Sequence, residues 1–127
     1  METLEELKLY LRSNSIGDKG CRGLAAGLAR MQKIQKLVVD LARNKIGDDG
    51  CQQLSEALAK METLEELKLY LRSNSIGDKG CRGLAAGLAR MQKIQKLVVD
   101  LARNKIGDDG CQQLSEALAK METLEEL

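Results

Sequence analysis

The chain has 127 residues and carries 20 Lys and Arg against 19 Asp and Glu, which gives a net charge of +1. Because the charges are evenly balanced, no basic stripe forms, and this argues against nucleic acid or an anionic membrane as the principal partner. The sequence has no His, so the usual catalytic triads and His-based acid–base chemistry cannot be assembled.

The apolar runs of the sequence are only a few residues long, which is too short for a transmembrane helix. The first residues also lack the charged and then apolar order of a signal peptide. We therefore expect a cytoplasmic protein, a location that does not apply if the chain is synthetic.

Residues 61–120 repeat residues 1–60 letter for letter, and the chain then begins the same phrase again. Each 60-residue block divides into two thirty-residue forms, A and B, that align without a gap. A period of this size predicts a solenoid, whose units bury their apolar faces only against their neighbours. Identical copies are typical of an engineered or consensus array, or of a very recent duplication. We predict one domain, 1–127, made of units 1–30, 31–60, 61–90 and 91–120 and a partial unit, 121–127.

The first element expected in each unit is a strand. In form A, Leu7, Leu9 and Leu11 alternate with polar or amphipathic side chains, which is the period-two pattern of a strand with one buried face. Form B repeats this alternation over residues 37–41.

A turn and a helix follow the strand. Residues 14–20 are rich in turn-forming residues, and Asp18 is a candidate N-cap. The helix is expected to end near Arg30, and near Lys60 in form B, where a basic residue is favourably placed at the negative end of the dipole. An apolar stripe at helical spacing runs along Cys21, Leu24, Ala25 and Leu28. Each unit is therefore one βα unit, and successive strands are expected to be parallel.

These units resemble the leucine-rich repeat. The motif L-x-x-L-x-L-x-x-N-x-L is approximated by Leu4, Leu7, Leu9, Asn14 and Ile16. The I-G-D-x-G-C run before a helical L-x-x-x-L is similar to the ribonuclease-inhibitor-like class, which includes the repeat regions of NOD-like receptors. The resemblance covers essentially the whole chain. It implies an α/β solenoid, an open horseshoe arc with parallel strands on its concave face and helices on its convex face.

The thirty-residue unit is longer than the usual repeat of that class, which has about 28 or 29 residues. Both halves of the motif fit only if two residues were added between Leu7 and Asn14. A dipeptide insertion keeps every side chain on its own face, so we predict a strand about one dipeptide longer than usual. If Tyr10 and Leu11 instead form a bulge, the concave face is re-aimed.

The resemblance also implies a ladder of buried amides that bond to turn backbone in their own and neighbouring repeats. A purely structural role fits this position, because a buried amide needs partners; a catalytic asparagine is the alternative. The ladder residues are Asn14, Asn44, Asn74 and Asn104.

One cysteine occurs in each unit at the same phase: Cys21, Cys51, Cys81 and Cys111. Stacked units place them in a row about 8 to 10 Å apart, too far for disulfides, so we expect reduced core residues. A zinc site is the alternative, and it lacks both His and a CxxC pair. We expect no metal and no cofactor.

The face of the sheet opposite the helices is expected to be open and polar. In-register strands place Glu6 beside Lys36 and Tyr10 beside Asp40, so opposite charges answer one another and the face is largely self-neutralised. The same alternation predicts that Ala42 also faces outward. A half (β/α)8 barrel closed by dimerisation would need an apolar face here. Besides a purely solvated surface, a binding face is possible, with candidate contacts Lys8, Tyr10, Arg12, Val38, Asp40, Lys68, Tyr70, Arg72, Val98 and Asp100.

Other short motifs have structural explanations. The GDKG and GDDG runs lack the spacing and lysine of a phosphate-binding loop, and Asp48–Asp49 lacks the ligand alternation of an EF-hand. Gly23 and Gly27 weaken a helix, so they either allow close approach of a neighbouring helix or were inherited from a natural template, the reading we favour from sequence. We expect no enzymatic activity.

The two ends of the chain suggest association. A solenoid needs polar terminal caps, and here the chain opens on one strand and stops at Leu127 inside another. We therefore hypothesise a non-enzymatic structural scaffold that self-associates as a homo-oligomer, either head to tail or as an isologous dimer or strand exchange. The alternative is an intracellular protein-binding leucine-rich-repeat module that uses its concave face.

Overall fold

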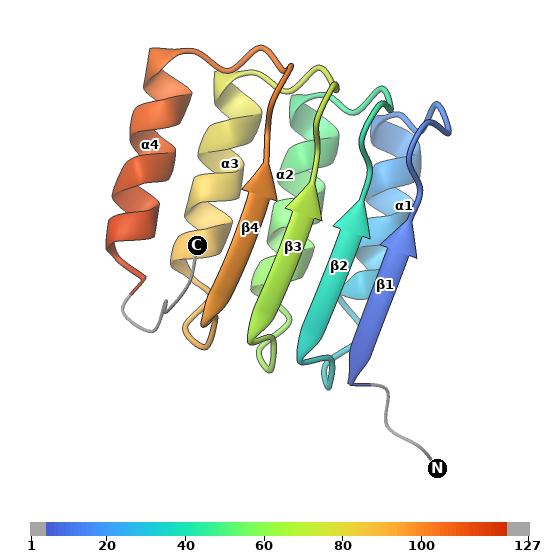
Figure 1. Cartoon of the computed structure of the whole chain (residues 1–127), viewed down its shortest axis with the longest axis vertical. Coiled ribbons are helices and arrows are strands. Elements are labelled where there is room, and N and C mark those ends of the chain that lie inside the picture. Colours follow the sequence, from blue (N-terminus) through green and yellow to red (C-terminus); the bar gives the residue numbers. More distant parts are fainter. Residues whose placement is uncertain (1–4, 122–127) are drawn as a thin grey trace.

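The computed structural model describes residues 5–121, in which strands and helices alternate (Figure 1). The strands are β1 (Glu6–Tyr10), β2 (Lys36–Asp40), β3 (Glu66–Tyr70) and β4 (Lys96–Asp100). The helices are α1 (Asp18–Leu28), α2 (Asp48–Ala59), α3 (Asp78–Ala89) and α4 (Asp108–Ala119). The partial unit predicted at 121–127 lies outside the described residues, except for Met121.

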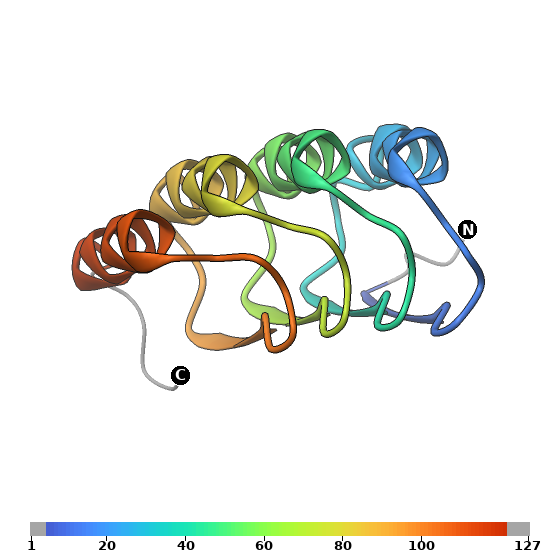
Figure 2. The ribbon, with the colours of Figure 1, turned by 90° about the horizontal axis from the view of Figure 1, so that it is seen from above.

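The four strands form one parallel sheet in the order β1-β2-β3-β4, as the repeated βα units predict. The pairing is in register, with Glu6 opposite Lys36 and Tyr10 opposite Asp40. All four helices cover the same face of the sheet, and the view from above shows a gently curved two-layer solenoid (Figure 2). The other face of the sheet is left open, so the arrangement is an open solenoid of βα units and not a barrel. No helix among residues 5–121 is long and apolar enough to cross a membrane.

The extra dipeptide extends the buried set without a bulge. Each strand has only five residues, yet inter-repeat bonds continue beyond it, from Leu11 N to Asp40 O at 2.8 Å and from Ser13 N to Ala42 O at 3.0 Å. In the second repeat Leu41 follows β2 and is fully buried. Ser13 then turns the chain with a φ of 60°, in the left-handed region. The strand thus ends at Tyr10, and its alternation is continued by the residue after it.

Ala42 corrects one expectation. Strand alternation predicts that it faces outward, but it is fully buried, because the chain already turns at this residue and its N–H bonds to Asp40 Oδ1 at 3.1 Å. Alternation along a strand therefore ceases to predict the face once the turn begins.

The core lies between the sheet and the helices. Cys21, Cys51 and Cys81 belong to it and have no exposed surface, and all four thiols are free. Cys111 was expected to join them but is exposed, because no described repeat follows α4. Residues of identical sequence therefore differ in burial according to which repeat stands beside them.

Asp18 is not the N-cap of its own helix, contrary to the sequence prediction. Gly17 holds that position and Asp18 is the first helical residue. The Asp18 carboxylate instead accepts hydrogen bonds from the N–H groups of Gly47 at 2.7 Å and Gly50 at 3.0 Å, at the start of α2. Helix α2 is therefore capped by the repeat before it, and we call this contact the inter-repeat cap. Asp48 and Asp78 repeat it at the next two junctions.

Candidate protein-binding surface

The asparagine side chains link each turn to the next. Asn44 Nδ2 donates to Leu11 O at 3.0 Å and Leu41 O at 2.9 Å, while its Oδ1 accepts from Ile16 N at 2.8 Å. Asn74 makes the same set of contacts one repeat later, and it is buried like Asn44. Asn14 is exposed, and its side-chain Nδ2 donates to Leu11 O and Arg12 O of its own turn. Both Oδ1 and Nδ2 of each buried side-chain amide are hydrogen-bonded to backbone, which leaves no free group for catalysis.

The ten predicted contact residues lie on the four strands or directly after them. Lys8, Val38, Lys68 and Val98 form one row across the sheet, and Tyr10, Asp40, Tyr70 and Asp100 form the next. Arg12 and Arg72 stand beyond the ends of β1 and β3 and reach the adjacent Asp row. Arg12 Nε lies 3.4 Å from Asp40 Oδ2, and Arg72 Nε lies 3.1 Å from Asp100 Oδ2.

Two lysines of this face, Lys36 and Lys68, form none of its ion pairs. The remaining pairs on this face join Lys8 to Glu6 at 3.5 Å and Lys96 to Glu66 at 3.7 Å. Among residues 5–121, no ion pair involves Lys36 or Lys68. Lys36 lies opposite Glu6, as the in-register arrangement predicts, but Glu6 makes its ion pair with Lys8 of its own strand. Sequence alternation could not reveal this choice, because both lysines are within reach of the carboxylate.

A shallow hollow of about 240 Å³ occupies the middle of the concave face. Tyr10 of β1 and Tyr70 of β3 line it, and Val38 of β2 lines it from the neighbouring row. Tyr10 is 67% exposed on the edge strand β1, whereas Tyr70, with a strand on each side, is partly buried. The two unpaired lysines, Lys36 and Lys68, line the same hollow.

Asp100, at the end of this face, has its pKa lowered from the usual 3.8. The main cause is the hydrogen bond from the N–H of Ala102, and the Arg72 guanidinium adds to it. The carboxylate is therefore held charged and oriented at the strand end, which is a structural use of the group.

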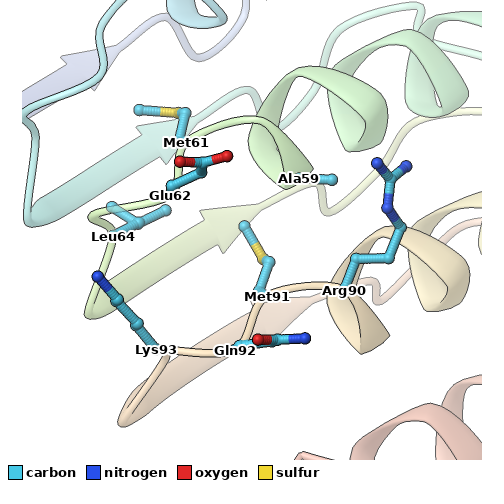
Figure 3. A pocket seen from close by; sticks show the side chains of 8 residues that line it. All are labelled: Ala59, Met61, Glu62, Leu64, Arg90, Met91, Gln92 and Lys93. Atoms are coloured by element: carbon cyan, nitrogen blue, oxygen red, sulfur yellow. The ribbon is translucent and has the colours of Figure 1, made fainter.

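A second hollow, of about 400 Å³, lies between the loops that follow α2 and α3 (Figure 3). Its lining is mixed: Met61, Leu64 and Met91 give apolar surface, and the rest is Ala59, Glu62, Arg90, Gln92 and Lys93. This set offers no thiol or hydroxyl nucleophile and no imidazole. Within residues 5–121, no three acidic or Cys side chains gather in a way that could hold a metal ion.

The cysteines are buried and bonded. Burial raises the pKa of Cys21 to about 11 and that of Cys51 to about 12. The Sγ atoms of Cys21 and Cys51 lie 3.4 and 3.5 Å from Gly50 O and Gly80 O of the following helices. Thiols held in this way are poor nucleophiles and act as packing groups.

Comparison with known proteins agrees with this geometry. The fold is similar to the actin-binding site 2 fragment of leiomodin-1, with a TM-score of 0.75 and 18% identity over 94% of this chain and 68% of that one. It is also similar to the C-terminal domain of Caenorhabditis elegans tropomodulin, with a TM-score of 0.71 and 20% identity over 97% of this chain and 71% of that one. A sequence search among curated proteins finds no significant match.

The family described as Leucine Rich repeat matches the sequence four times, over residues 3–25, 35–55, 61–85 and 95–115. Each match spans a strand, the following turn and the first part of a helix. The repeated βα units, the asparagine-linked turns and these matches agree in phase, and the chain belongs to the leucine-rich repeat family.

Proposed function

We propose that this protein is a non-enzymatic repeat scaffold that binds another protein through the concave face of its sheet. The observation that carries the proposal is the hollow that Tyr10 and Tyr70 line together with Val38 and the unpaired Lys36 and Lys68. Tyr is one of the residue types that concentrate binding energy at protein interfaces, and the lysines add positive charge beside it. The fitting partner is a segment that offers an apolar side chain to the tyrosines and carboxylates to the lysines.

The similar solved structures support protein binding as the general role. The leiomodin-1 fragment is named as an actin-binding site, and that activity belongs to leiomodin-1. For this chain the likeness supports an open repeat surface of suitable size, which is the usual binding surface of solenoids. A cytoplasmic location accords with the four free thiols.

A random-peptide display library tests the proposal. Selection on the immobilised wild-type chain is expected to enrich peptides that combine acidic and apolar residues. Lys68→Glu and Tyr70→Ala are each expected to weaken binding of the selected peptides by about tenfold, corresponding to about 1.4 kcal/mol. The matched control is Glu56→Lys on the opposite, helical face, where the residue is exposed and distant from the hollow. Binding that survives the two concave-face variants, or that Glu56→Lys weakens equally, contradicts the proposal.

Self-association is the second candidate function, and it accords with an engineered or consensus origin of the identical units. The observation that favours it is the flank of α4, where Leu114 and Leu118 are partly exposed whereas the equivalent Leu54 and Leu58 are buried. A scaffold with such a flank can add further copies of itself. Sedimentation at several protein concentrations tests this: a mass that rises with concentration supports it, and a monomer at every concentration refutes it.

A further inference from the structure

The junction between the second and third repeats contains the two sequences that would meet if two copies of the chain stacked end to end. Residues 31–60 are identical to residues 91–120, and residues 61–90 are identical to residues 1–30. The surface that α2 and β2 present to the third repeat is therefore repeated in α4 and β4. We propose that two copies join head to tail, with β1 and α1 of one copy taking on β4 and α4 of the other the place that β3 and α3 take on β2 and α2.

This inference rests on the proposed self-association and specifies its interface. We call the proposed contact the seam. In the internal junction β2 pairs with β3 in register, Lys36 opposite Glu66 and Asp40 opposite Tyr70. The same register in the seam sets Lys96 opposite Glu6 of the second copy and extends one continuous parallel sheet.

The apolar surface needed for the seam is open at α4. A hollow of about 290 Å³ lies there between the sheet and the helix, lined by Leu97, Val98, Val99, Leu114 and Leu118. In the second repeat the equivalent leucines of the helix are only 1% exposed, because the third repeat covers them. A second copy would bury this surface with side chains that already fit its sequence twin.

The inter-repeat cap gives the seam a polar anchor. At the internal junction Asp48 Oδ1 accepts from Gly77 N at 2.7 Å and Gly80 N at 2.9 Å. Asp108 holds the same place at the start of α4 but bonds to no helix within residues 5–121. The N–H groups of Gly17 and Gly20, at the start of α1, likewise donate to no side chain in the described part of the chain. The donors and the acceptor of one further cap are thus present at opposite ends of the solenoid.

Helix α1 also has a glycine at a position where, in α3, a neighbouring helix packs closely. A Cβ at Gly87 of α3 would lie 2.9 Å from Ser55 O and 3.3 Å from Ser55 Cβ, so this glycine is required by the close approach of α2. Its equivalent in α1, Gly27, has no atom within 4 Å of the same position. Close approach therefore explains the glycine in α3, against the inheritance reading, and α1 has the same glycine facing open space.

A neighbouring glycine pair provides the contrast. A Cβ at Gly83 would lie 3.4 Å from Gln52 Cγ and 3.6 Å from Gln52 Cα, which is ordinary van der Waals contact. Gly23 is the equivalent residue in α1, and it too faces open space. The seam therefore tolerates a methyl group at Gly23 but not at Gly27.

Residues 121–127 repeat the sequence of residues 1–7, and both match residues 61–67. The contacts proposed for the seam from residue 8 onward in the second copy do not depend on these segments.

Sedimentation velocity of three full-length chains tests the seam: wild type, Gly27→Ala and Gly23→Ala. The wild type is expected to grow in mass with concentration. Gly27→Ala should require at least about tenfold more protein for the same degree of association, because a methyl group forced against backbone cannot be accommodated. Gly23→Ala should stay within about twofold of the wild type, since its methyl group makes only ordinary contact.

A second pair of variants uses the cap. Asp108→Ala should weaken association by about tenfold, because two charge-assisted bonds are lost. Asp109→Ala removes the same charge from the same helical turn, but Asp109 pairs with Arg82 of its own chain at 2.6 Å and should leave association unchanged. If the wild type is monomeric throughout, self-association itself is wrong. If it associates but Gly27→Ala matches Gly23→Ala, or Asp108→Ala matches Asp109→Ala, the seam is wrong while self-association stands.

Discussion

Gly27 of α1 and Gly87 of α3 hold the same position in helices of the same sequence. Replacing each by Ala therefore separates the effect of packing on stability from the effect of helix propensity. Gly87 is buried against α2, and an added Cβ would lie 2.9 Å from a backbone oxygen that cannot rotate away. Overpacking of this kind costs about 1–3 kcal/mol. The gain in helix propensity on replacing Gly by Ala is about 0.5–1 kcal/mol. Gly87→Ala should therefore destabilise the chain, whereas Gly27→Ala, which meets open space, should stabilise it.

Urea denaturation followed by circular dichroism measures this difference, at a protein concentration low enough to keep each chain monomeric. The two variants are expected to differ by about 1–3 kcal/mol in the free energy of unfolding. With an m-value of about 2 kcal/mol per molar urea, the midpoints should differ by about 0.5–1.5 M. Equal midpoints, or a more stable Gly87→Ala, would refute the claim that close helix approach requires this glycine.

The other predictions concern the ladder, the cap and acid. Asn74→Ala should lower the free energy of unfolding by about 2–4 kcal/mol, because several buried backbone groups lose their partner, and Asn14→Ala by less than about 1 kcal/mol in the same denaturation assay; equal losses would contradict the ladder. Asp48→Ala should cost about 1–2 kcal/mol through the lost cap of α3, while Asp108→Ala should have little effect on the monomer; similar losses would contradict the inter-repeat cap. The pKa of Asp100 is lowered when folded, so its stabilisation is present above its usual pKa and is lost as pH falls through the folded pKa. The stability difference between wild type and Asp100→Asn should therefore shrink as a denaturation series is taken to lower pH, and a constant difference would count against that assignment.

Most of the fold could be predicted because the same strand and helix patterns occur in all four units. The alternation of Leu7, Leu9 and Leu11 predicts one buried face, and the helical stripe after it predicts the covering layer. Identical phase in every unit then predicts parallel, in-register strands. Local pattern and repetition agree at each position, so one reading satisfies all four units.

The contacts between repeats were harder to predict, because they depend on residues about thirty positions apart. Asp18 looks like a cap for its own helix, and only the stacking of repeats shows that its carboxylate reaches Gly47 and Gly50. The glycines of form A could not be interpreted from propensity, because the atom that excludes a side chain at Gly87 belongs to Ser55 of another repeat.

The burial of side chains in the last repeat could not be predicted from the sequence either. Cys51 and Cys111 have identical flanking sequences for many residues on each side, yet one is fully buried and the other exposed. A pattern specifies the face that a side chain occupies, whereas the neighbouring repeat decides whether that face is covered.

The reactivity of Cys111 gives the most direct test of the claim that every junction joins the same two surfaces. It is the one exposed thiol within residues 5–121, and burial raises the pKa of the other three cysteines. In the seam Cys111 would be covered as Cys51 is by the third repeat. The account predicts that modification of Cys111 by a thiol reagent at pH about 8 slows as protein concentration rises, and that Gly27→Ala removes this protection. A rate independent of concentration, or equal protection in Gly27→Ala, would contradict the account.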